Sequence, residues 1–192
     1  MPVTEALYII LISLELLLLG IAATYAVLFV YSWLQGAPYV PTQNKEVQTI
    51  LKEANIQKSM TFLELGCGDG RVTREAVKQY QVKGIGIDIN PELVIRARIL
   101  AKRDNLSGIE FHRKNITDTD VSKADVIYIF LFPALIERIK EKLLHQTKQE
   151  ALIISHGFKI PFLSSMLVKE LKGTKFTTYY YQKVQSLIDK SL

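Results

Sequence analysis

The sequence has 192 residues, a formal net charge of +5 and a hydrophobic content of 48%. Its length indicates one domain with room for an appendage. The single cysteine, Cys67, excludes a disulfide bridge within the chain, which suits a reducing compartment.

The first predicted element is a long apolar helix near the N-terminus. The run from Leu7 to Leu34 holds no lysine or arginine and one acid, Glu15. It exceeds the roughly 20 residues that span a bilayer, and Tyr31 and Trp33 near its end suit a membrane interface. A cleaved signal peptide is the alternative, but no basic segment precedes the run, and the run is longer than such signals. We expect residues 1–36 to be a retained membrane anchor.

Charge on either side of the span predicts its orientation. No lysine or arginine precedes it, whereas Lys45 and Lys52 follow it. The positive-inside rule then predicts a single-pass protein whose C-terminal domain lies in the cytoplasm or on the equivalent side of an organelle membrane.

The chain after the span predicts alternating helices and strands. Pro38 and Pro41 indicate a short extended linker, and an amphipathic helix over 44–56 follows, with Asn44 or Thr42 as its cap. We expect strands over 60–66, 82–88, 109–114, 124–132, 150–156 and 175–184, and helices over 70–80, 90–105, 133–147 and 162–172.

This alternation predicts an α/β fold, with a mostly parallel sheet and helices on both faces. We therefore divide the chain into an anchor over 1–36, a linker and amphipathic helix over 37–58, and a Rossmann-like domain over 59–192. In such sheets, ligands bind at the carboxyl ends of the strands.

A glycine-rich turn follows the first strand of that domain, in "FLELGCGDGR". Gly66, Gly68 and Gly70 alternate, and Glu64 lies two residues ahead of the first. A P-loop would end in Gly-Lys-Ser/Thr, and a dinucleotide fingerprint would need glycine where Arg71 stands. Backbone without side chains at the start of a helix nevertheless suits a ligand that approaches closely.

This spacing resembles motif I of class I S-adenosylmethionine-dependent methyltransferases. The strand "GIGID" ends in Asp88, the acid that the resemblance expects on the ribose hydroxyls, and "RKNIT" supplies an amide near the adenine. The resemblance therefore implies S-adenosyl-L-methionine as cofactor and no metal. The cofactor-binding residues that we expect are Thr42, Glu64, Gly66, Cys67, Gly68, Gly70, Asp88, Ile89, Asn115 and Ile116.

Some of these positions have two interpretations. Thr42 is either a cofactor contact or a helix cap, and Asp69 either touches the cofactor or is a solvated turn residue. Cys67 fits a small loop residue better than a nucleophile, because no histidine stands near it in sequence. Asn115 stands where the family more often has aspartate.

Further segments narrow the resemblance. "PYVPT", "ADVIYIFLFP" and "IISHGF" resemble small prokaryotic methyltransferases and the membrane-anchored lysine methyltransferases of the ATP synthase c-subunit and the adenine nucleotide translocase. Enzymes that methylate exocyclic amino groups of bases or glutamine usually carry Asn/Asp-Pro-Pro-Tyr at the end of strand four. This chain has "FLFP" there, which argues against those substrates. We expect Phe130, Phe132, Pro133 and His156 to line the acceptor site. The phenylalanines could instead pack in the core, and the histidine could be a hydrogen-bonded strand end.

The leading hypothesis is a membrane-anchored enzyme that methylates lysine in a membrane or membrane-associated protein. A methyltransferase for a lipid, a quinone or another small membrane molecule is the alternative, and a non-catalytic S-adenosylmethionine-binding scaffold is a third. A nucleic-acid substrate is disfavoured, because the basic residues are interspersed with acids, as in "IERIKEKLL".

Overall fold

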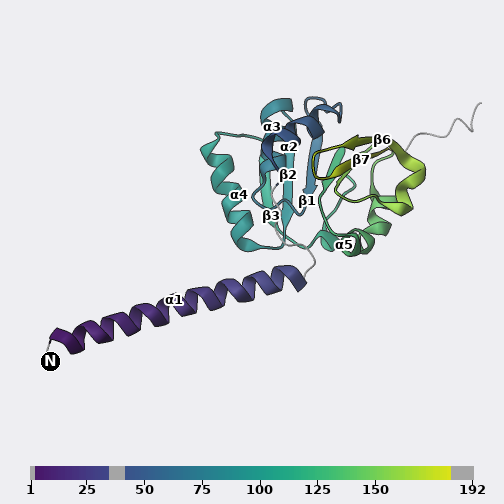
Figure 1. Cartoon of the computed structure of the whole chain (residues 1–192). Coiled ribbons are helices and arrows are strands. Elements are labelled where there is room, and N and C mark those ends of the chain that lie inside the picture. The colour runs from purple at the N-terminus through teal and green to yellow at the C-terminus, as the bar shows by residue number, and fades with distance from the viewer. Residues whose placement is uncertain (1–2, 35–41, 183–192) are drawn as a thin grey trace, which may run out of the picture. The chain divides into compact units, whose positions relative to one another are not determined.

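The computed structural model describes residues 3–34 and 42–182, so the predicted linker at Pro38 and Pro41 lies outside the described residues. The chain divides into two compact units, Met1–Pro38 and Tyr39–Leu192. The first unit contains α1 (Val3–Leu34), a single continuous helix (Figure 1).

The composition of α1 suits a bilayer. Its segment Glu5–Val30 has a mean hydropathy of 2.4, and none of it is buried within the structure. The hydroxyls of Ser13 and Thr24 donate to the carbonyls of Ile9 and Gly20, so these polar groups are satisfied inside the helix. By length and composition the helix could cross a membrane, and a signal sequence has the same features.

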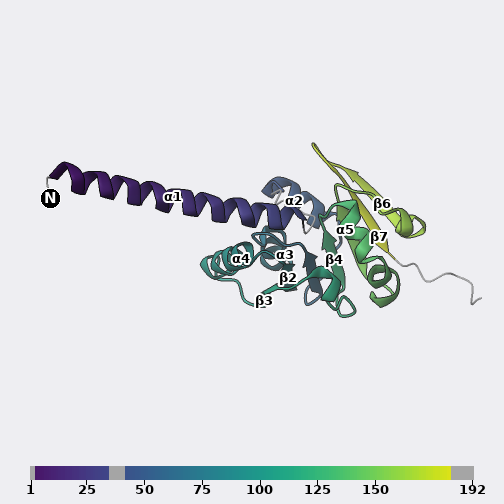
Figure 2. The ribbon, with the colours of Figure 1, turned by 90° about the horizontal axis from the view of Figure 1, so that it is seen from below.

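The second unit is built on a seven-stranded sheet with the order β3-β2-β1-β4-β5-β7-β6. Strands β1 to β5 run parallel, whereas β7 pairs antiparallel with both β5 and β6. The strands are β1 (Thr61–Leu65), β2 (Lys83–Asp88), β3 (Ile109–Arg113), β4 (Val126–Ile129), β5 (Leu152–His156), β6 (Leu167–Lys172) and β7 (Thr177–Gln182). Both ribbon views show β3 and β6 at opposite ends of the sheet (Figures 1 and 2). The predicted α/β fold is confirmed.

The helices of this unit are α2 (Asn44–Lys52), α3 (Arg71–Tyr80), α4 (Pro91–Arg103) and α5 (Pro133–Arg138). Short helical turns are η1 (Ile116–Asp118), η2 (Lys142–Gln146) and η3 (Pro161–Met166). The predicted cap of α4 is confirmed, because the Asn90 side chain accepts from the N–H groups of Glu92 and Leu93. The predicted cap of α2 is wrong, since Gln43 takes that position without a side-chain hydrogen bond.

Two other expectations differ from the structure. The single helix expected over 133–147 is divided, because α5 ends at Arg138 and a π-helical turn, η2, follows. The helix expected over 162–172 is wrong in its second half. Residues Leu167–Lys172 form strand β6, whose side chains alternate between half-buried and exposed. A two-residue alternation is typical of a strand. The segment becomes a strand and not a helix because it pairs with β7.

Both faces of the sheet are covered. Successive strand residues point to opposite faces. On β1, Phe62 and Glu64 point to one face and Leu63 and Leu65 to the other, and all four are buried. The core on the first face joins α2 and α3 to the sheet through Val47, Ile50, Leu51, Val72, Ala76, Val126, Tyr128, Ile154 and Tyr180.

Candidate active site

The glycine loop joins β1 to α3 in a conformation that only glycine adopts readily. Gly66, Gly68 and Gly70 have φ values of +79°, +54° and +72°. A methyl group at Gly66 would lie 2.7 Å from a side-chain carbon of Leu131, and one at Gly70 would lie 2.4 Å from the ring of Phe111. The loop therefore presents bare backbone at the start of α3, where the helix N-terminus favours negative charge.

Asp88 joins the end of β2 to this loop. One carboxylate oxygen accepts from the N–H of Gly68 and the other from the N–H of Asn90, both at 2.8 Å. Burial raises the pKa of Asp88, and the N–H groups of Asn90, Gly68 and Ile89 oppose that shift. Each oxygen keeps a second lone pair, so the carboxylate can still accept hydrogen bonds from a diol.

Glu64 is turned toward α3. It is 4% exposed, and its carboxylate accepts from the backbone N–H of Thr73 at 2.9 Å and from the Thr73 hydroxyl. Burial raises the pKa of Glu64 to about 8, and the two hydrogen bonds from Thr73 only partly oppose this shift. The structure therefore gives Glu64 a role in fixing the start of α3 against β1.

Arg71 connects the glycine loop to the segment that enters the domain. Its Nε and Nη2 donate to the two carboxylate oxygens of Asp69 at 3.1 and 3.0 Å, and its Nη1 donates to the carbonyl of Thr42 at 2.8 Å. Thr42 is buried beside this network. A planar guanidinium suits this arrangement because it can bond two acceptors in fixed directions.

Asn115 lies at the same edge of the sheet as Asp88. Strand β3 pairs with β2 up to the Asp88–Arg113 pair, and Asn115 follows two residues later. Its side chain accepts from the N–H of Thr117 at 3.1 Å, which caps η1, and Ile116 beside it is buried. Ile89 follows Asp88 and is half-buried.

Cys67 has no nucleophilic character in this fold. It is 4% exposed, and burial together with the nearby charges of Glu64 and Asp88 raises the pKa of its thiol. Because the thiolate is the reactive form, this environment keeps the cysteine inert.

An aromatic cluster lies where β4 and β5 end. The rings of Phe130 and His156 meet edge to face at 4.6 Å, and Phe176 from the β6–β7 turn contacts both, at 5.4 and 5.5 Å. Phe132 packs on Phe158 at 5.7 Å and keeps 42% of its surface exposed. The predicted acceptor residues therefore lie at one edge of the sheet but in separate contacts, Phe130 with His156 and Phe132 with Phe158, and Pro133 begins α5 directly after Phe132.

His156 is the polar member of this cluster. It is 1% exposed, its Nδ1 lies 2.9 Å from the Thr178 hydroxyl, and burial lowers its pKa to about 4. Its Nε2 is buried and, among the described residues, has no hydrogen-bond partner. The ring is therefore neutral at physiological pH, and one nitrogen remains available.

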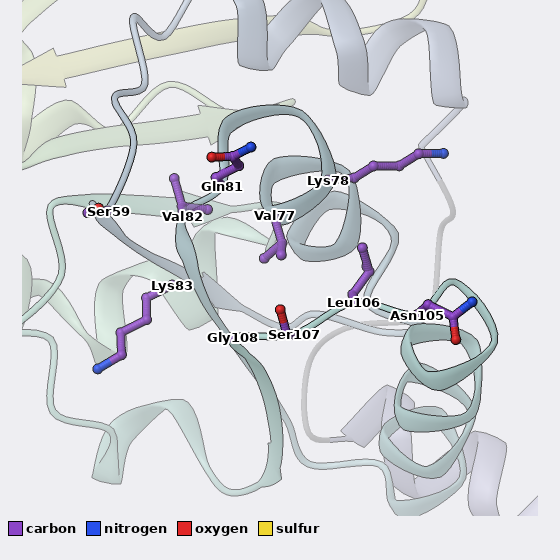
Figure 3. A pocket seen from close by; sticks show the side chains of 10 residues that line it. All are labelled: Ser59, Val77, Lys78, Gln81, Val82, Lys83, Asn105, Leu106, Ser107 and Gly108. Carbon is purple, nitrogen blue, oxygen red and sulfur yellow. The ribbon is translucent and has the colours of Figure 1, made fainter.

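A hollow on the domain, shown in Figure 3, has none of these groups in its lining. Its lining includes Ser59, Lys83 and Gly108, which stand at the amino ends of β1, β2 and β3. The glycine loop and the aromatic cluster lie at the carboxyl ends, where ligands bind in open parallel sheets. Within the described ranges, no group of three or more His, Cys, Asp or Glu side chains is arranged to hold a metal ion.

Comparisons with known proteins agree with this geometry. The sequence model of the ANTKMT methyltransferase domain family matches residues 64–166. A protein-lysine N-methyltransferase of Saccharolobus islandicus is 33% identical over 131 residues, which cover 67% of this chain and 81% of the relative. The adenine nucleotide translocase lysine N-methyltransferase of Mus musculus is 27% identical, over 65% of this chain and 54% of that protein. The lysine N-methyltransferase of the ATP synthase c-subunit from Caenorhabditis elegans is 26% identical, over 65% of this chain and 68% of that protein.

A solved structure extends the likeness to the fold. The crystal structure of an RNA methyltransferase from Salinibacter ruber in complex with S-adenosyl-L-homocysteine superposes with a TM-score of 0.71 at 26% identity, and the match covers 77% of this chain and 96% of that one. With the glycine cradle and the acid after β2, these matches show that the chain belongs to the ANTKMT methyltransferase domain family and is an S-adenosylmethionine-dependent methyltransferase.

Proposed function

We propose that this enzyme is anchored in a membrane and methylates lysine side chains of a membrane or membrane-associated protein. The observation that carries the proposal is the cluster of Phe130, His156 and Phe176 at the carboxyl ends of β4 and β5, on the same edge as the glycine loop. The names of the relatives from Saccharolobus, mouse and Caenorhabditis, all lysine N-methyltransferases, support the choice of acceptor.

The cofactor half of the proposed site combines the glycine loop with the ends of β2 and β3. S-adenosylmethionine, when bound, supplies a methyl group already activated on a sulfonium. Asp88 would hold the ribose hydroxyls, and bare backbone at Gly66 and Gly70 would allow close approach. We assign cofactor binding to Thr42, Glu64, Gly66, Cys67, Gly68, Gly70, Asp88, Ile89, Asn115 and Ile116, with Glu64 and Cys67 acting through the shape of the loop.

The acceptor half is lined by Phe130, Phe132, Pro133 and His156. Aromatic faces attract a lysine ammonium, and their apolar surface packs on its alkyl stem. A lysine amine must lose its proton before it can accept a methyl group, and an apolar environment lowers its pKa from the usual 10.4. In the tautomer whose Nδ1 donates to the Thr178 hydroxyl, Nε2 of His156 would accept from an amine N–H and orient the nitrogen.

Anchoring in a bilayer through Leu7 to Leu34 completes the proposal. A tethered enzyme meets substrates in the same membrane at a raised effective concentration. The lysines after the span favour a domain on the cytoplasmic or equivalent side. Alkaline carbonate extraction of membranes tests the anchor. Retention in the pellet is expected, and release of the intact chain would overturn it.

The acceptor is tested by labelling. Membranes that lack this protein are incubated with the purified chain and methyl-labelled S-adenosylmethionine, beside an Asp88→Ala variant. Acid hydrolysis and amino-acid analysis should then show label in methylated lysine, and the variant should lose it.

Two other outcomes would reject the proposal. Label in extractable lipid and none in amino acids would identify a methyltransferase for a lipid, a quinone or another small membrane molecule. No label in either fraction, with S-adenosylmethionine binding intact, would identify a non-catalytic scaffold.

A further inference from the structure

A carboxylate that the sequence does not single out lies beside the turn between β6 and β7, the turn that carries Phe176 of the aromatic cluster. Glu46 stands in the first turn of α2, and its Oε1 is buried. Among the described residues, no donor hydrogen-bonds to this oxygen. A buried carboxylate oxygen without a donor is costly, because burial removes the water that would otherwise solvate it.

The neighbour of this oxygen is the turn between β6 and β7. A methyl group built on Gly173 would lie 2.6 Å from Glu46 Oε1, so the carboxylate rests against the backbone of that glycine. The N–H of Gly173 donates to the carbonyl of Phe176 at 2.9 Å. The N–H of Gly173, although close to Glu46, is therefore already bonded to another acceptor and does not satisfy the carboxylate.

The same turn carries one wall of the proposed acceptor site. Phe176 contacts Phe130 and His156. His156 Nε2 and the Tyr128 hydroxyl are, like Glu46 Oε1, buried polar atoms without a hydrogen-bond partner among the described residues. Tyr128 lies two residues before Phe130 on β4. Burial raises the pKa of its hydroxyl, and the nearby carboxyl groups of Glu64 and Glu46 raise it further.

We propose that Glu46 is the specificity residue that binds the positive charge of the substrate. The inference rests on the lysine activity proposed above. Its carboxylate would accept a charge-assisted hydrogen bond from the substrate ammonium while Phe130 and Phe176 pack on the alkyl stem. A cation supplies the donor that the buried oxygen lacks, whereas an uncharged isostere of the same shape leaves the charge unpaired. Glu46 therefore captures the substrate in its protonated form, a step that precedes the loss of the proton and the methyl transfer.

The test uses the full chain in nanodiscs, loaded with S-adenosylhomocysteine. The probes are n-butylammonium, which is the lysine side chain without its backbone, and n-butanol, its uncharged counterpart. Ligand-observed NMR titration should show about ten-fold tighter binding of the ammonium by the wild type. Glu46→Gln should abolish that preference, and Glu46→Asp should keep part of it.

Glu53→Gln is the matched control, because it removes one negative charge from the end of the same helix, where Glu53 pairs with Lys169. It should keep the preference for the ammonium. S-adenosylhomocysteine affinity should be the same in all variants, which excludes misfolding. An unchanged preference in Glu46→Gln, or no preference in the wild type, would overturn the inference.

The labelling experiment separates this inference from the proposed function. If the wild type puts no label into lysine but still prefers n-butylammonium in a Glu46-dependent way, the protein substrate is rejected and the cation site stands. If lysine is labelled and Glu46→Gln changes neither the preference nor the amount of substrate needed for half-maximal labelling, the role of Glu46 is rejected alone.

Discussion

The carboxylate of Asp88 accepts a 2.8 Å hydrogen bond from the backbone N–H of Gly68, which fixes the glycine loop to the end of β2. Its other oxygen accepts a hydrogen bond from the N–H of Asn90. Both oxygens of Asp88 act as acceptors. An asparagine at this position would place its NH₂ group, a donor, against one of the two backbone N–H groups, which are donors as well.

Asp88→Asn should therefore weaken cofactor binding and stability together. We expect at least about ten-fold weaker binding of S-adenosylhomocysteine, and a loss of about 1–2 kcal/mol in the free energy of unfolding. Isothermal titration and urea denaturation measure the two effects. Unchanged affinity would remove Asp88 from the cofactor site.

The close contact between Gly70 and Phe111 gives a second prediction. Gly70→Ala adds a methyl group 2.4 Å from the ring at a φ of +72°, whereas Gly108→Ala adds one in open space at +71°. The control should lose about 1 kcal/mol from backbone strain alone. Gly70→Ala should lose about 1–3 kcal/mol more, because the added methyl group overpacks the core. If urea denaturation gave the two variants equal losses in the free energy of unfolding, the Phe111 ring would be shown to move aside at no cost.

His156 makes stability depend on pH. Burial lowers its pKa from 6.5 to about 4, so in mildly acidic solution the unfolded chain binds a proton that the folded chain does not. Its contribution is complete above about pH 6.5 and is lost as the pH falls toward 4. Between pH 7 and pH 5 the wild type should lose about 2 kcal/mol more than His156→Gln does. Parallel losses in denaturant titrations would contradict this.

The bridge from Arg71 to Asp69 and Thr42 leads to a fourth prediction. A lysine cannot bond both partners in the same geometry, so Arg71→Lys should loosen the start of α2. Exchange of the Val47 amide, which donates to Gln43 at 3.0 Å, should become faster. The free energy of unfolding should fall by about 1 kcal/mol. Arg103→Lys, at an exposed ion pair, is the control and should leave exchange at Val47 unchanged.

The structural features that the sequence predicts correctly are those that short segments determine. The glycine turn between β1 and α3, the strand that ends at Asp88 and the Asn90 cap each depend on residues within a few positions of one another. The sequence predicts helix where β6 forms, because "FLSSMLVKELK" alone fits both periods and the strand conformation depends on pairing with β7.

The sequence does not predict a role for Glu46 or Phe176, and the reason is similar. An acid in the first turn of an amphipathic helix is common because the helix dipole favours it, so nothing in the local sequence marks Glu46. Phe176 reaches the acceptor edge only through the turn that joins β6 to β7. Segments far apart in sequence place Phe176 beside Phe130 and His156, and place Glu46 beside Gly173 of the same turn.

Two residues beside the proposed acceptor site come from outside the segment that the family model matches. The glycine loop, Asp88, Phe130 and His156 lie within residues 64–166, whereas Glu46 precedes that segment and Phe176 follows it. Exchanging only the α2 segment and the β6–β7 turn with those of a relative would leave the cofactor half intact. Under the proposed role of Glu46, acceptor preference would change by recombination of the two flanks, without a change in the glycine loop or Asp88.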